Sequence, residues 1–135
     1  MTRDHDMTHF VIWQRLEGAL VFLAALALTW WIGADLPWWL AVLAFFAPDL
    51  SFLFYGLGSR VGGFAYNSVH TYGFGAAVLA LGLACGLPVL AAMGALWLGH
   101  CGFDRMLGYG LKSRESFSET HLGRIGKARQ TSQTR

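Results

Sequence analysis

The chain alternates between long apolar runs and short polar joints, and this pattern predicts its elements. A transmembrane helix needs about 20 mostly apolar residues. Four runs are long enough, and we expect spans over about residues 10–33, 37–58, 63–85 and 88–111. Glycine and proline mark the joints between them, as is typical of turns. Because the joints are short, neighbouring helices should be antiparallel, so the sequence predicts an all-α, four-helix membrane bundle.

Composition supports the membrane interpretation. Hydrophobic residues make up 55% of the 135 residues and charged ones 13%, against about 45–50% and about 25% in soluble domains. The lipid bilayer is therefore the expected partner. The net charge of +2 is small and spread along the chain, which does not favour a nucleic-acid partner. The first segment, residues 1–9, contains acidic residues and lacks a small-residue cleavage site, so no cleaved signal peptide is expected.

Basic residues predict the orientation of the spans. The first and third joints contain no lysine or arginine, whereas Arg60 lies in the second joint and basic residues flank both ends of the chain. By the positive-inside rule, both termini and the second joint face the cytoplasm, which predicts a multi-pass protein of the inner membrane. The polar tail, residues 112–135, is basic and is expected to lie near anionic lipid.

Each predicted span carries an ionisable side chain at a similar depth. With a helical rise of about 1.5 Å per residue, these groups lie roughly 9–15 Å below the cytoplasmic surface. They are Glu17, Asp49, His70, His100 and Asp104. A charge at the bilayer centre costs about 2.5–3.5 kcal/mol, so we expect the five side chains to face one another inside the bundle. The i,i+4 spacing of His100 and Asp104 puts both on one helix face.

The residue types in this polar centre predict metal chemistry. Imidazole nitrogen and carboxylate oxygen are ligands of zinc, manganese and iron. We expect one divalent transition metal to be held by four side chains: Asp49, His70, His100 and Asp104. Glu17 or Asp49 would then act as the general base in metal-assisted hydrolysis of a lipid-like substrate.

We expect several other residues to support the polar centre or to lie outside it. Asn67, three residues before His70, is expected to support the centre through hydrogen bonds. Arg105 either binds a substrate anion or extends to lipid phosphate. Tyr66 and Tyr109 are expected at the membrane interface. His121 could fold back from the tail as a further ligand.

Five short runs surround these residues. They are RLEG (15–18), APDLS (47–51), YNSVHTY (66–72), HCGFDRMLGYGLK (100–112) and THLGRIG (120–126). Together they resemble a family of small bacterial four-helix membrane proteins, domain of unknown function 4260. The resemblance covers about Trp13 to Gly126 and implies the fold and the membrane location. A looser similarity to bacterial inner-membrane metal-dependent hydrolases implies hydrolysis.

Other functions fit the same residues, and the sequence leaves open whether the protein is an enzyme. A proton- or ion-coupled carrier would use the Asp, Glu and His side chains as a relay. The outer halves of the spans lack ionisable residues, so a homo-oligomer would have to complete that relay. Haem could be bound by His70 and His100. A structural or interaction protein would use the polar centre only to fix helix register.

Overall fold

The computed structural model describes residues 2–113 and 119–124. Within them, helical segments follow one another and a short hairpin comes last. They are α1 (Thr2–Ile32), α2 (Trp38–Phe46), the 3₁₀ helix η1 (Ala47–Leu57), α3 (Ser59–Val69), α4 (Tyr72–Ala84), α5 (Pro88–Leu107), and the antiparallel strands β1 (Glu119–Thr120) and β2 (Gly123–Arg124). Apart from this hairpin, the described residues confirm the prediction of an all-α chain.

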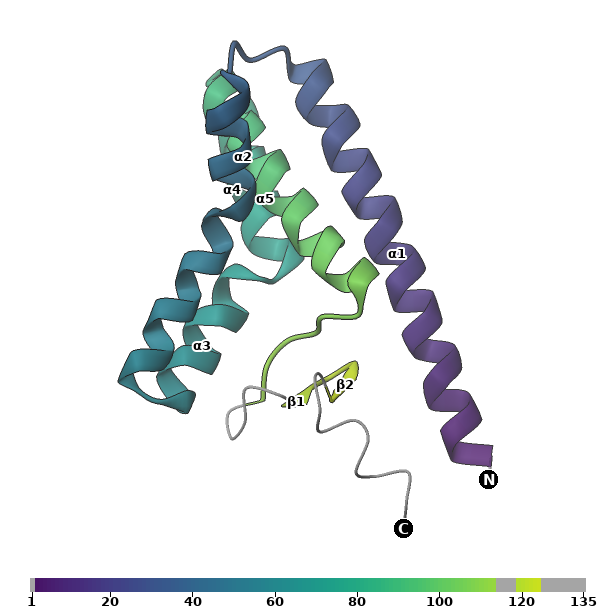
Figure 1. Ribbon diagram of the computed structural model, residues 1–135. Coiled ribbons are helices and arrows are strands. Elements are labelled where there is room, and N and C mark those ends of the chain that lie inside the picture. Colours follow the sequence, from purple (N-terminus) through teal and green to yellow (C-terminus); the bar gives the residue numbers. More distant parts are fainter. Residues whose placement is uncertain (1, 114–118, 125–135) are drawn as a thin grey trace.

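Helix α5 lies at the centre of the fold, with α1, α4 and α2 packed around it (Figure 1). Small residues let the helix backbones approach closely. A Cβ built on Gly102 of α5 would lie 2.7 Å from the carbonyl oxygen of Gly18 on α1. A Cβ on Gly75 of α4 would lie 2.7 Å from the backbone nitrogen of Leu98 on α5. Close contact on these two sides fixes the rotation of α5, and therefore the direction of its polar side chains.

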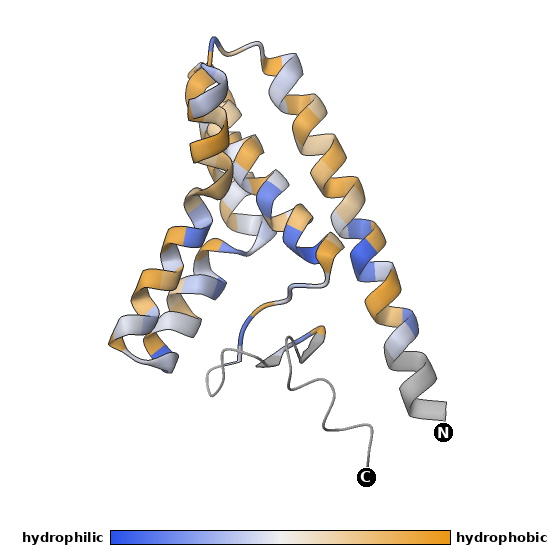
Figure 2. Cartoon of the chain, in the orientation of Figure 1, coloured by the Kyte–Doolittle hydropathy of each residue, from blue (hydrophilic) through white to orange (hydrophobic). Residues whose placement is uncertain are grey.

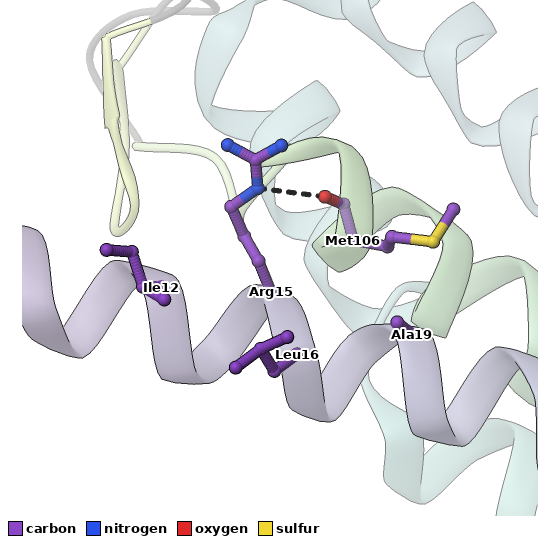
Figure 3. Close-up of a pocket in the computed structure, with 5 residues that line it drawn as sticks. All are labelled: Ile12, Arg15, Leu16, Ala19 and Met106. Carbon is purple, nitrogen blue, oxygen red and sulfur yellow. Dashed lines mark hydrogen bonds between the residues drawn. The ribbon is translucent and has the colours of Figure 1, made fainter.

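The end of α5 is tied down by local hydrogen bonds. Gly108 adopts φ +91°, a conformation that favours glycine, and the N–H of Tyr109 donates to the carbonyl of Asp104 at 2.8 Å. This pairing is a Schellman motif, which stops the helix just after its polar residues. Arg15 of α1 donates from Nε to the carbonyl of Met106 at 2.9 Å, beside an apolar hollow (Figure 3).

Two stretches in the described part of the chain have the length and the apolar composition that crossing a membrane requires. They are Thr8–Ile32 and Trp38–Leu57, and Tyr72–Ala84 is a shorter apolar helix. Figure 2 shows the apolar residues along α1 and α2 and hydrophilic residues in the lower half of α5. Helix α1 starts at Thr2, well before the predicted start near residue 10.

Neither of the two middle predicted spans is a continuous α-helix. The span expected over 37–58 changes from α2 to the 3₁₀ helix η1 at Ala47. Pro48 explains this change, because its ring clashes with the carbonyl four residues earlier and it donates no backbone hydrogen bond. The span expected over 63–85 bends at His70 and Thr71, between α3 and α4. Both irregularities lie next to predicted site residues.

Candidate metal centre

The bend between α3 and α4 is stabilised by side chains from α5. A bend leaves backbone carbonyls without helical donors, and three residues spaced four apart on one face of α5 reach them. Trp97 Nε1 donates to Val69 O at 2.7 Å, Cys101 Sγ lies 3.7 Å from Val69 O and 3.8 Å from Thr71 O, and Arg105 Nη2 donates to His70 O at 3.3 Å. The irregular backbone is therefore satisfied inside the protein.

His70 occupies this bend in a defined tautomer. Its Nδ1 lies 2.9 Å from the carbonyl oxygen of Tyr66. A carbonyl oxygen only accepts hydrogen bonds, so Nδ1 must carry the proton. In the neutral ring, Nε2 then presents a lone pair, which is the form that binds a metal. The phenol ring of Tyr66 also stacks on the imidazole, with centroids 3.7 Å apart. Hydrogen bond and stacking together fix the direction of Nε2.

Four potential ligand atoms converge in front of His70 Nε2. His100 Nε2 lies 3.3 Å from it, and Asp49 Oδ1 lies 3.4 Å from His70 Nε2 and 3.3 Å from His100 Nε2. Asp104 Oδ2 is 3.7 Å from both imidazole nitrogens. All four atoms lie within 4.8 Å of one another. The structure thus brings together the four residues that the sequence predicts as metal ligands.

The spacing of these atoms fits a metal ion. Ligands bound at about 2.0–2.1 Å in a tetrahedron lie about 3.3 Å apart, close to the separations of 3.3–3.7 Å seen here. The donation of His70 Nδ1–H to a backbone carbonyl is also the usual arrangement of a metal-binding histidine. A group of two histidines and two aspartates with this geometry can hold a divalent metal.

The four residues differ in their access to the surroundings. The side chains of His70, His100 and Asp104 are 0%, 1% and 13% exposed, whereas that of Asp49 is 37% exposed. Phe45 and Phe46 present their rings to His100 at centroid distances of 5.3 and 6.0 Å. The centre is therefore enclosed on most sides and reached from the side of Asp49.

Tyr66 belongs to the site, although the sequence places it at the membrane interface. Its side chain is 1% exposed, and its hydroxyl donates to Asp104 Oδ2 at 3.2 Å. The interfacial prediction is therefore wrong for this residue. The i,i+4 spacing of Tyr66 and His70 within one short run was the signal available in the sequence.

Three other predicted residues lie outside the four-residue group. Arg105 is 6% exposed and donates to the carbonyls of His70 and Tyr109, so it does not extend to lipid phosphate. Asn67 bonds both backbone groups of Lys112, at 2.7 and 2.8 Å, and thereby holds the chain after α5. Glu17 lies on an exposed part of α1 and is not brought to the cluster.

His121 folds back as a hydrogen-bond partner of the backbone. Its Nδ1 accepts from the N–H of Leu111 at 2.8 Å, and its own N–H donates to the carbonyl of Leu111 at 3.2 Å. It is not part of the ligand group found among the described residues. Partial burial and the positive charge of Arg105 lower the pKa of His121 below its ordinary value of 6.5.

This contact should weaken in acid. Protonation of Nδ1 removes the acceptor for the Leu111 N–H, so the docked segment binds fewer protons than the released one and loses stability as the pH falls below 6.5. Hydrogen–deuterium exchange, corrected for the intrinsic rate, should show protection of the Leu111 N–H at neutral pH and progressive loss of that protection as the pH falls below 6.5. His121→Gln keeps an acceptor without the titration. If the protection of Leu111 depended on pH equally in the wild type and in His121→Gln, protonation of His121 would not be the cause.

Fold and site together define a helical protein with a buried His/Asp cluster of the metal-ligand type. The chain belongs to the family described as Domain of unknown function (DUF4260), which matches residues 11–125. This match confirms the resemblance seen in the sequence. No curated protein and no solved structure matches the chain. The family description carries no activity.

Proposed function

We propose that this protein is a multi-pass inner-membrane metalloprotein that hydrolyses a lipid-like substrate at the cluster of Asp49, His70, His100 and Asp104. The observation that carries the proposal is the convergence of four lone-pair donors from η1, α5 and the bend after α3. Such a group is stable in a buried setting when a cation neutralises it. Zinc, manganese and iron all accept this ligand set.

The arrangement of the helices supports four membrane crossings. Crossings by α1, by α2 with η1, by α3 with α4, and by α5 would put the start of α1, the turn between η1 and α3, and the β1–β2 hairpin at one end (Figure 1). That end carries Arg60, Lys112 and Arg124, as expected for the cytoplasmic side. Large apolar side chains point outward at all depths, among them Trp30, Leu43, Leu53 and Phe64. A bilayer would cover this surface.

The four ligands have different parts in the proposed reaction. A bound divalent metal would supply a Lewis acid and lower the pKa of a water molecule. His70, His100 and Asp104 are nearly buried and would hold the ion, with Asp104 oriented by Tyr66. Asp49 is the accessible ligand, and its second carboxylate oxygen can accept the proton of the attacking water. Glu17 is exposed on α1 and is not among the four clustered residues, which supports Asp49 as the general base.

Hydrolysis can be tested in nanodiscs with phospholipid and fatty-acyl ester substrates. The wild type should show turnover that a chelator abolishes and metal restores. Asp49→Asn keeps a ligand oxygen but loses the base, and it should reduce kcat by about 100-fold or more. Glu17→Gln is the matched control and should retain wild-type kcat. Turnover that survives Asp49→Asn, or the absence of metal-dependent turnover in the wild type, would overturn the hydrolase.

A further inference from the structure

The 3₁₀ geometry of η1 creates a row of side chains beside the metal centre. Side chains three residues apart eclipse one another in a 3₁₀ helix. Phe46, at the cap of η1, Asp49 and Phe52 therefore form one row, in which the accessible ligand lies between two aromatic rings. The centroid of the Phe46 ring lies 6.0 Å from that of the His100 ring, and the centroid of the Phe52 ring lies 6.4 Å from that of the His70 ring. The row thus runs directly along the open side of the centre.

The members of this row are exposed, and the apolar surface continues beyond them. Phe46 is 50% exposed, Phe52 is 37% exposed, and the Asp49 side chain is 37% exposed. One turn before Phe46, Leu43 is 61% exposed on the same side of α2. A molecule that reaches Asp49 must therefore pass over apolar surface, and this surface extends from the centre along α2.

We infer that the substrate is a membrane lipid that enters sideways from the bilayer, with its acyl chain along Phe46 and Leu43 and its scissile ester at Asp49. This inference rests on the proposed function. In the orientation proposed above, α2 lies farther from the cytoplasmic surface than η1 does. A lipid acyl chain points toward the bilayer centre, so it would follow α2 while the head group lies toward Phe52. A polar ester without an acyl chain would have nothing to pack along this surface.

Alkyl hydroxamates test the acyl site without requiring turnover, because the hydroxamate chelates a metal. The series from acetyl to myristoyl hydroxamate is titrated into the Co²⁺-loaded protein in nanodiscs, and the visible spectrum of the cobalt reports binding. Because longer chains also partition into the bilayer, affinity is referred to the hydroxamate concentration in the lipid. Packing of the chain against Phe46 and Leu43 should still make the wild type bind myristoyl hydroxamate several-fold more tightly than acetyl hydroxamate. Phe46→Ala and Leu43→Ala each remove part of this contact and should bind myristoyl hydroxamate several-fold more weakly than the wild type.

Two controls separate the acyl site from its surroundings. Phe54→Ala removes a ring of 48% exposure from the same 3₁₀ helix outside the row, and it should retain the wild-type chain-length dependence. Acetyl hydroxamate should bind Leu43→Ala and Phe54→Ala as tightly as it binds the wild type, because neither side chain is among those that enclose the four clustered residues. A chain-length dependence unchanged in Phe46→Ala and Leu43→Ala would overturn the acyl site alone. Failure of the wild type to bind cobalt would overturn the metal centre and this inference with it.

Discussion

His100→Ala is expected to weaken the binding of a divalent metal by at least about 100-fold. The change removes one of four ligands, and even the loss of a group that only orients a ligand costs about 10–100-fold. His100 Nε2 lies within 3.7 Å of the other three ligand atoms, so no other described side chain can take its place without moving the helices. Competition against a fluorescent chelator in detergent would measure the affinity.

Two further variants test the ligand assignment by the size of their effect on metal affinity. Tyr66→Phe removes the hydroxyl that donates to Asp104 Oδ2 and should weaken metal binding by about tenfold, since the four ligands remain. His121→Ala removes a histidine from outside the cluster and should leave the affinity unchanged. If His121→Ala weakened metal binding as strongly as His100→Ala, the ligand assignment would be wrong.

Arg105→Met is expected to lower the free energy of unfolding by about 3 kcal/mol. The side chain is 6% exposed and donates to the carbonyls of His70 and Tyr109. Each buried acceptor left without a donor costs about 1–3 kcal/mol, and the His70 carbonyl lies at the bend, where the helix supplies no replacement. Thermal unfolding in detergent should show a midpoint lower by about 10 °C.

Arg15→Met is the matched control for this change. Arg15 also donates to a backbone carbonyl, that of Met106, but it does so on the exposed surface of α1. Water or lipid head groups can replace the lost donor there, so the loss should stay below about 1 kcal/mol. Equal destabilisation by the two changes would show that the bend does not depend on Arg105.

Depth along the helices predicted the members of the cluster but could not predict which faces meet. Asp49, His70, His100 and Asp104 meet as expected, because polar groups that lie among apolar helices are stabilised by one another. Glu17 has a similar depth but a different rotation. Gly18 packs against α5, and Glu17, one residue away, points about 100° to the side. Helix rotation depends on glycine contacts between segments far apart in sequence.

The bend at His70 could not be predicted from local sequence patterns either. The run YNSVHTY contains neither glycine nor proline, the residues that normally mark a break. The backbone groups at the bend are satisfied by Trp97, Cys101 and Arg105, about thirty residues further along the chain. Local patterns therefore favoured a continuous helix, and tertiary contacts determined the outcome. Pro48 offered a local signal for the other irregularity, the change from α2 to η1.

The metal content of the purified wild-type protein shows directly whether the four clustered residues form a metal centre. The tag is removed, the protein is loaded with zinc, manganese or iron in turn, excess metal is dialysed away, and elemental analysis gives the ratio of metal to chain. We expect one ion per chain in the wild type and none in the double variant His70→Ala, His100→Ala. A wild type that retains no metal after all three loadings would contradict this expectation, and the polar centre would then be a proton-relay or structural site.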